Sequence, residues 1–255
     1  MKVTSSILCG DNAQLLRKLA ANSVQLTVTS PPYDSLRTYK GYSWNFEAVA
    51  KELWRVTRPG GVVVWVVGDQ TKNGSESGTS FRQALYFKEI GFNLHDTMIY
   101  EKNSYMPLTH NRYEQAWEFM FVFSKKSPSV FNPIKVPCAT VGSYRNRGGA
   151  KHYEASHSER RREEKTPVNA EKYHSNVFVY DVGKNEKTAH NAPFPEALAR
   201  DHIASWSNPR DLVLDPFIGS GTTGKMAKLL GRNFVGFDIS EEYCKLARER
   251  IRNAK

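Results

Sequence analysis

The sequence has few cysteines and no long apolar run. Its three cysteines, Cys9, Cys138 and Cys244, are odd in number, lie far apart and lack the spacing of metal ligands, so we predict neither a disulfide framework nor a metal site. No run approaches the ~20 apolar residues that a membrane-spanning helix needs, and the opening MKVTSSILCGDN lacks the apolar core of a signal peptide. We therefore expect a cytoplasmic protein with no membrane partner.

Acidic residues are too few to balance the basic ones. The 255 residues include 36 Lys and Arg against 26 Asp and Glu, a net charge of +10. Residues 125–176 alone hold eleven basic and five acidic residues, with little apolar periodicity and several Pro, Gly and Ser. Such clustering favours a polyanionic partner such as nucleic acid, although the mixed-sign run SERRREEK (158–165) by itself is typical of a solvated surface. We interpret 125–176 as an insert.

Apolar residues otherwise follow strand and helix periods in alternation. They alternate from position 24 to 29, as in a strand, and recur at helical spacing between 46 and 56. The continuous run VVVWVV (62–67) predicts a strand buried on both faces. This alternation predicts one large α/β domain with a mainly parallel, doubly wound sheet. The expected strands are 24–29, 62–67, about 93–100, 117–123, 212–214 and 233–237, and the expected helices are 46–56, 81–90, 194–206, one from the glycine turn to 230, and 241–252.

The stretch LVLDPFIGSGTTGKM (212–226) predicts a strand, a glycine turn and a helix. Such a turn lets backbone N–H groups at a helix N-terminus approach a ligand. Gly219, Gly224 and Lys225 match a phosphate-binding loop, but Met226 stands where that loop needs a hydroxyl for Mg²⁺. Because a thioether is a poor Mg²⁺ ligand, a nucleotide triphosphatase is the weakest of three interpretations.

The same glycines also suit an adenosine-containing cofactor. Gly219, Gly221 and Gly224 satisfy G-x-G-x-x-G, and Asp238, at the end of FVGFD, is placed to accept hydrogen bonds from ribose hydroxyls. The pattern fits NAD about as well as S-adenosylmethionine. Few residues follow this turn, so the remaining strands must come from the N-terminal half. The segment TSPPY (29–33) then opens on the same crevice as the glycine turn.

The segment TSPPY ends the first expected strand and is poorly suited to sheet pairing. Proline cannot donate to a ladder and restricts the residue before it. Taken alone, the segment could equally be a proline-stiffened turn. Beside a cofactor turn, a hydroxyl and an aromatic ring that flank two prolines favour a role in holding a substrate.

These two segments occur with four others in a characteristic order. They are LCGDNAQLL (8–16), FEAVAKELWRVTRPGG (46–61), HNAPFPEALARDHI (190–203) and GFDIS followed by EEYCKLARERI (236–251). In this order the sequence resembles the DNA methyltransferases that modify N4 of cytosine or N6 of adenine, in their permuted subgroup with the catalytic motif before the cofactor motif. The resemblance implies S-adenosylmethionine as cofactor, duplex DNA as partner and a mostly parallel seven-stranded sheet.

The resemblance also divides the chain and assigns its residues. It implies a catalytic part (1–124), a basic target-recognition insert (125–176) and a cofactor-binding part (177–255) of one methyltransferase domain. Among the residues that it assigns to the cofactor, Phe194 and Phe217 could instead be core aromatics, and Asp11 and Asp238 could instead be helix caps. The implied cofactor-binding residues are Asp11, Phe194, Pro195, Asp215, Phe217, Gly219, Gly221, Thr222, Thr223 and Asp238.

The catalytic residues implied are Ser30, Pro31, Pro32 and Tyr33. An exocyclic amino group is a poor nucleophile because its lone pair is delocalised into the ring. If the Ser30 hydroxyl and the Pro31 carbonyl each accept one N–H hydrogen, the lone pair is localised. The base must first be rotated out of the duplex, and Tyr33 offers a face on which it can stack. In this family a serine at position 30 is associated with N4-cytosine more than with N6-adenine, which remains the nearest alternative.

Contacts to DNA and to other proteins are less specific in the sequence. Arg37 and Lys40 follow the catalytic segment, whereas Arg145, Arg147 and Lys151 lie in the insert, and each could contact phosphates or base edges. A non-catalytic nucleic-acid-binding module and a methyltransferase for RNA or a small molecule are the alternatives from other classes. A homodimer and a separate cognate restriction endonuclease stay open, as does a prokaryotic, archaeal or phage source.

Overall fold

A computed structural model describes residues 5–32, 44–105, 111–146, 165–181 and 194–255. The chain divides into two compact units, one of Met1–Asn132 with Asn176–Lys255 and one of Pro133–Ser175. The second unit begins eight residues later than the insert expected from the sequence. Residues 125–132 belong to the first unit because the Gly60 N–H donates to the Lys125 carbonyl and the Asn132 N–H to the Ser205 carbonyl, 2.8 Å away.

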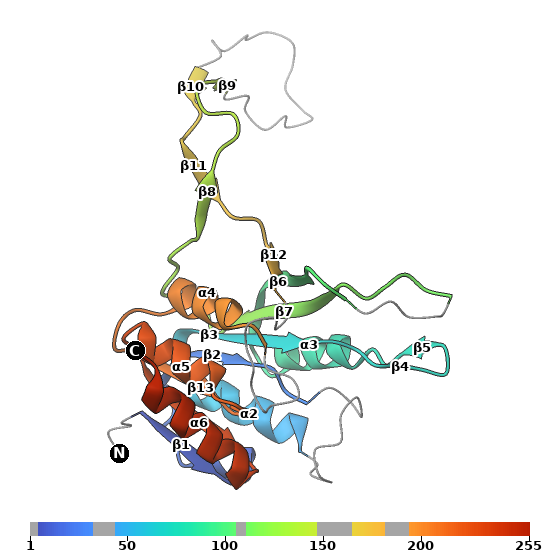
Figure 1. Cartoon of the computed structure of the whole chain (residues 1–255), viewed down its shortest axis with the longest axis vertical. Coiled ribbons are helices and arrows are strands. Elements are labelled where there is room, and N and C mark those ends of the chain that lie inside the picture. Colours follow the sequence, from blue (N-terminus) through green and yellow to red (C-terminus); the bar gives the residue numbers. More distant parts are fainter. Residues whose placement is uncertain (1–4, 33–43, 106–110, 147–164, 182–193) are drawn as a thin grey trace. The chain divides into compact units, whose positions relative to one another are not determined.

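One sheet of eight strands forms the centre of the first unit (Figure 1). Seven strands are parallel, and only β7 runs antiparallel to its neighbours. The predicted mostly parallel, doubly wound sheet is confirmed, with one strand more than the seven that the family resemblance implies. Its two edge strands, Ser6–Cys9 and Val177–Tyr180, are not among the six expected from apolar periodicity. The strand order is β1 (Ser6–Cys9), β14 (Asn233–Asp238), β13 (Leu212–Asp215), β2 (Val24–Thr29), β3 (Thr57–Val67), β7 (Trp117–Ser124), β6 (Asn93–Lys102) and β12 (Val177–Tyr180).

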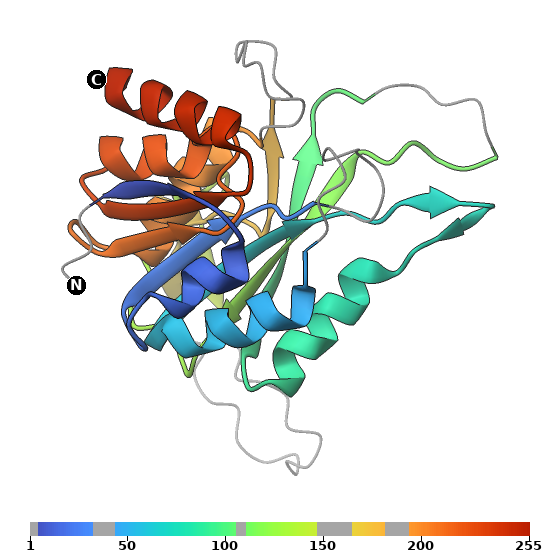
Figure 2. The same cartoon turned by 90° about the horizontal axis from the view of Figure 1, so that it is seen from below.

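Helices cover both faces of this sheet (Figure 2). The helices α1 (Asn12–Arg17), α2 (Phe46–Val56) and α3 (Thr79–Glu89) pack on one face, and α4 (Glu196–Trp206), α5 (Thr222–Leu229) and α6 (Glu241–Asn253) pack on the other. Each layer has its own apolar core, so the strands between them are buried on both sides, as VVVWVV predicted. In the described part of the chain, no helix combines the length and the apolar character needed to cross a membrane.

The remaining strands form small hairpins. In the first unit, β4 (Thr71–Lys72) pairs with β5 (Ser75–Glu76). In the second unit, β8 (Lys135–Pro137) pairs antiparallel with β11 (Glu171–Tyr173), and β9 (Tyr144–Asn146) pairs with β10 (Lys165–Pro167). The second unit is therefore a ladder of short antiparallel pairs without a helix among its described residues.

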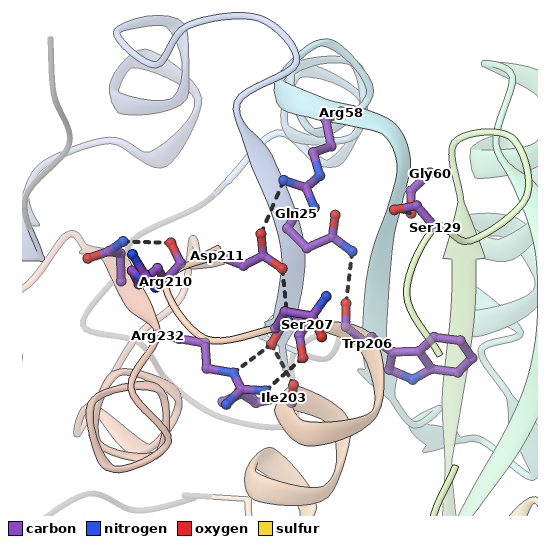
Figure 3. A network of polar contacts seen from close by, with 12 residues as sticks. Gln25, Arg58, Gly60, Ser129, Ile203, Trp206, Ser207, Arg210, Asp211 and Arg232 are labelled. Atoms are coloured by element: carbon purple, nitrogen blue, oxygen red, sulfur yellow. Dashed lines mark hydrogen bonds and ion pairs between the residues drawn. The ribbon is translucent and has the colours of Figure 1, made fainter. Parts of the chain in front are cut away.

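The direction of winding reverses between β2 and β13. From β2 the chain passes through α2 to β3 on one side, and from β13 it passes through α5 to β14 on the other. Ligands of open α/β sheets bind at the carboxyl ends of strands at such a switch point. At the amino ends, polar contacts join neighbouring segments (Figure 3): Gln25 Nε2 donates to the Trp206 carbonyl at 2.9 Å, and Arg58 Nη1 pairs with Asp211 Oδ1 at 3.1 Å.

Candidate active site

The catalytic segment and the glycine turn meet at the carboxyl ends of β2 and β13. The two strands pair through Leu214 and Thr27. Thr29 Oγ1, one residue before Ser30, donates a 2.6 Å hydrogen bond to Asp215 Oδ1. The Phe217 N–H donates to the same oxygen at 3.0 Å. One carboxylate oxygen thus joins the strand that carries Ser30 to the strand that leads into the glycine turn.

Asp215 is buried, with a side chain that is cut off from solvent. Burial raises the pKa of its carboxyl to about 6, and hydrogen bonds from Thr29, Thr223 and the Phe217 N–H oppose that rise. The sequence placed Asp215 among the cofactor-binding residues. In the structure its carboxylate accepts hydrogen bonds from Thr29 and from the Phe217 N–H, an arrangement that positions the two motifs; its expected role in cofactor binding stays a prediction.

The glycine turn requires left-handed backbone conformations. Gly219 has φ 48° and Gly221 has φ 88°, a region that favours glycine. The Gly219 N–H donates to Asp238 Oδ2 at 3.1 Å, and the Ser240 N–H donates to Asp238 Oδ1 at 2.8 Å. Burial raises the pKa of the Asp238 carboxyl, against these backbone hydrogen bonds. Asp238 therefore holds the turn from the end of β14, while Ser240 itself caps α6.

Four more of the expected cofactor-binding residues lie next to the ends of strands and helices: Asp11, Phe194, Pro195 and Phe217. Asp11 follows β1 and caps α1, because its Oδ1 accepts from the Gln14 N–H at 2.8 Å. Pro195 is buried at the start of α4, and half-buried Phe194 packs against the core beneath α4–α6. Phe217 meets the ring of Trp44 edge to face, with centroids 4.7 Å apart. The sequence did not single out Trp44; its only signal was an aromatic residue at the end of the loop after TSPPY.

Both threonines of the turn bond to neighbouring elements. The Thr223 hydroxyl donates to the Val28 carbonyl at 3.2 Å, which ties α5 to β2. The Thr222 hydroxyl accepts from Arg250 Nη1 at 3.0 Å. Both residues are buried and make these bonds within the protein, and the cofactor-binding role expected of them stays a prediction.

The remaining expected residues belong to the catalytic segment and to the expected DNA contacts. Ser30, Pro31 and Pro32 directly follow β2, with Pro31 buried and the other two half-buried. Arg145 lies on β9 in the second unit. Tyr33, Arg37, Lys40, Arg147 and Lys151 fall outside the described residues.

Comparison with known proteins identifies the chemistry of the chain. The family model described as DNA methylase, for N6 and N4 amino methylation, matches residues 24–249. The chain belongs to this DNA methylase family. The orphan methyltransferase M.BamHII of Bacillus amyloliquefaciens is 51% identical over 91% of this chain and 89% of its own. The DNA adenine methyltransferase YhdJ of Escherichia coli is 28% identical over 96% of this chain and 82% of its own.

A solved structure supports the fold. The PvuII DNA methyltransferase, described as cytosine-N4-specific, superposes with a TM-score of 0.70 at 23% identity, covering 97% of this chain and 86% of that one. The methylase is thus an S-adenosylmethionine-dependent enzyme that methylates amino groups of DNA bases. When bound, the cofactor supplies an electrophilic methyl group on a sulfonium.

The residues present fit this cofactor. Asp238 is the last residue of β14, and Asp11 lies two residues after the adjacent strand β1, so both carboxylates are at one edge of the sheet, where they can accept from ribose hydroxyls. The methylase turn leaves no room for a side chain at Gly221, because a Cβ there would lie 3.0 Å from the Ala247 Cα and Cβ on α6. The close packing of α6 against the turn therefore fixes its path.

Gly221→Ala tests this packing against a matched glycine. We expect it to destabilise the methylase by more than the ~1–3 kcal/mol that an unfavourable backbone conformation costs, and to weaken S-adenosylmethionine binding, because α6 must shift. Gly231→Ala is the control, since Gly231 has φ 72° with nothing within 4 Å of its ideal Cβ. Urea unfolding and calorimetric binding measure both; equal losses of stability for the two variants would contradict the packing argument.

Charged side chains of α4, α5 and α6 form a network next to the glycine turn of the methylase. Sequence reasoning missed this network. Arg250 Nη1 donates to the Ser220 hydroxyl and to the Thr222 hydroxyl, both at 3.0 Å. Its Nη2 pairs with Glu196, which also accepts from Lys225 Nζ at 2.5 Å. Burial favours a higher pKa of the Glu196 carboxyl, but the contacts with Lys225 and Arg250 outweigh it and lower the pKa. Lys225, the lysine of the phosphate-loop interpretation, is thus engaged by a carboxylate.

We expect Arg250→Ala to weaken S-adenosylmethionine binding about 10- to 100-fold, because a charge-assisted hydrogen bond contributes about 1.5–3 kcal/mol. Glu196 starts α4 directly after Phe194 and Pro195, so the same arginine supports two segments of the expected cofactor pocket. The methyl-transfer kcat at saturating cofactor should change little. Arg252→Ala, an exposed arginine two residues along α6, is the control. A lower kcat with unchanged cofactor affinity would show that Arg250 does not act through the turn.

Proposed function

We propose that this methylase transfers a methyl group from S-adenosylmethionine to N4 of a cytosine flipped out of duplex DNA. The observation that carries the proposal is the position of Ser30: it follows the carboxyl end of β2, one residue from the Thr29–Asp215 bond that joins this strand to the cofactor turn. A nucleophile held at Ser30 and a methyl group held at the turn would then share one edge of the sheet.

Ser30 and Pro31 would prepare the amino group for attack. The Ser30 hydroxyl accepts one amino hydrogen and the Pro31 carbonyl accepts the other, which localises the nitrogen lone pair. The amino nitrogen would form its bond to the methyl carbon as that carbon leaves the cofactor's sulfonium, which would keep the electron pair, and the nitrogen would then release one proton to solvent. Proline fixes φ at Pro31 and Pro32, so the direction of the carbonyl is set with little loss of entropy.

Cytosine is proposed over adenine because of the serine at position 30. Both amino groups offer two hydrogens, and a hydroxyl can accept from either, so the preference comes from the family resemblance at that position. The relatives include a DNA adenine methyltransferase and a structure described as cytosine-N4-specific. Adenine N6 is therefore the alternative that the experiment must separate.

We further propose that the second unit, Pro133–Ser175, takes part in target recognition. Its described strands carry Arg145, Lys135 and Lys172, and it lies between the catalytic and cofactor-binding parts of the sequence. Lysine and arginine side chains bind phosphates, and arginine also reads guanine edges.

The product of the reaction tests the proposal. Duplex DNA is incubated with the methylase and S-adenosylmethionine, digested to nucleosides and analysed by mass spectrometry; we expect N4-methylcytosine. N6-methyladenine alone would replace cytosine by adenine and leave the amino-methyltransferase activity intact. Equal methylation of RNA would overturn the proposed duplex substrate.

A further inference from the structure

Cys9, Glu241 and Cys244 lie together although they come from opposite ends of the chain. In the pairing of β1 with β14, Cys9 is the partner of Asp238, and α6 begins three residues after Asp238. Both sulfur atoms and a Glu241 carboxylate oxygen lie within 4.8 Å of one another. The sequence predicted no metal site because the cysteines are far apart along the chain. That spacing does not reveal that the pairing of β1 with β14 brings Cys9 close to Cys244.

We propose that Cys9, Cys244 and Glu241 form a binding site for one soft divalent cation of the zinc class. Thiolates and carboxylates are typical Zn²⁺ ligands, and three protein ligands leave a fourth position for water. Each thiol gives up its proton to solvent as its sulfur binds the ion. The proposal goes beyond methyl transfer and uses none of the residues placed in the catalytic segment.

Negative charge lies next to the three candidate ligands. Cys9 is the partner of Asp238 in the pairing of β1 with β14, and Glu241 begins α6 three residues after that aspartate. Carboxylates beside the two sulfur atoms attract a positive ion.

A protein cation already occupies part of this environment. Arg248 Nη1 pairs with Glu241 Oε1 at 2.9 Å, and its Nη2 donates to the Ile7 carbonyl at 3.1 Å. A bound metal ion must compete with this guanidinium for the Glu241 carboxylate. Removal of the arginine charge should therefore tighten metal binding, a result that a fortuitous pair of thiols does not predict.

The test is a titration of the full chain with Cd²⁺ alone, followed by the ultraviolet absorbance of Cd²⁺–thiolate bonds. We expect saturation at one ion per chain. Cys9→Ser should weaken binding by about 100-fold or more, since even changes outside the ligand set commonly cost 10- to 100-fold. Cys138→Ser is the matched control: this third cysteine lies in the second unit and should leave the titration unchanged. Arg248→Gln should tighten binding several-fold.

Three results would overturn the proposal. They are no thiolate absorbance at one equivalent of Cd²⁺, unchanged binding in Cys9→Ser, and loss of binding in Cys138→Ser. Cys9 is exposed, so Cys9→Ser should fold normally, which a thermal melt verifies. Because the readout is absorbance, it is independent of methyl transfer and of the base that is methylated.

Discussion

Replacement of Ser30 by alanine is expected to lower the kcat for DNA methylation by about 100- to 1,000-fold, the usual effect of removing one oriented hydrogen-bonding group from a transition state. Without the hydroxyl, one amino hydrogen lacks its acceptor and the lone pair stays in the ring. The cofactor turn is held by Asp215, Asp238 and Arg250, so the affinity for S-adenosylmethionine should change less than about twofold. Single-turnover transfer of labelled methyl to DNA measures the first quantity, and calorimetry the second.

Ser23 provides the matched control for Ser30. It precedes the same strand at the opposite end, and its hydroxyl donates to the Ala20 carbonyl at 2.7 Å. Ser23→Ala should leave kcat nearly unchanged. If Ser30→Ala kept wild-type kcat, the proposed localisation of the amino lone pair would be wrong. A loss of cofactor affinity equal to the loss of kcat would instead show that Ser30 acts through the turn.

Local patterns were sufficient to predict most elements of the sheet. The strand β2 and the helix α2 begin and end where the sequence predicted, because alternating and helical periods are properties of neighbouring residues. The two edge strands, β1 and β12, were missed because four residues each give a weak periodic signal, and their strand character depends on pairing with β14 and β6.

Contacts between distant segments could not be predicted in the same way. The sequence placed TSPPY and the glycine turn in one crevice from strand topology alone, and the Thr29–Asp215 bond agrees with that placement. The Arg250–Glu196 pair and the Cys9–Cys244 neighbourhood join α6 to α4 and to β1. Their residues carry no local periodicity that marks a partner, so only the packed structure brings them together.

Two buried groups with shifted pKa values should make the stability of this methylase depend on pH in opposite directions. Asp215 has its carboxyl pKa raised from 3.8 to about 6, so the folded state binds the proton more tightly. Its contribution to the free energy of unfolding therefore falls by about 3 kcal/mol as pH rises from about 4 to 6. His202, buried on α4 with Nε2 3.2 Å from Met120 Sδ, has its pKa lowered by burial from 6.5 to about 4. Its contribution is full above pH 6.5 and is lost, also by about 3 kcal/mol, as pH falls toward 4.

Because the two contributions nearly cancel between pH 4 and 6, single variants should expose them. In wild type, protonation of Asp215 adds about 3 kcal/mol to the free energy of unfolding as pH falls from 7 to 4. Asp215→Asn lacks this gain, so its free energy of unfolding should fall by about 3 kcal/mol relative to wild type over that range. His202→Gln should gain a similar amount over the same range. Urea unfolding at several pH values measures both, and groups common to wild type and variant cancel in the difference. A flat difference curve for Asp215→Asn would show that this carboxyl has the same pKa in the folded and unfolded states, which would contradict the upward shift attributed to burial.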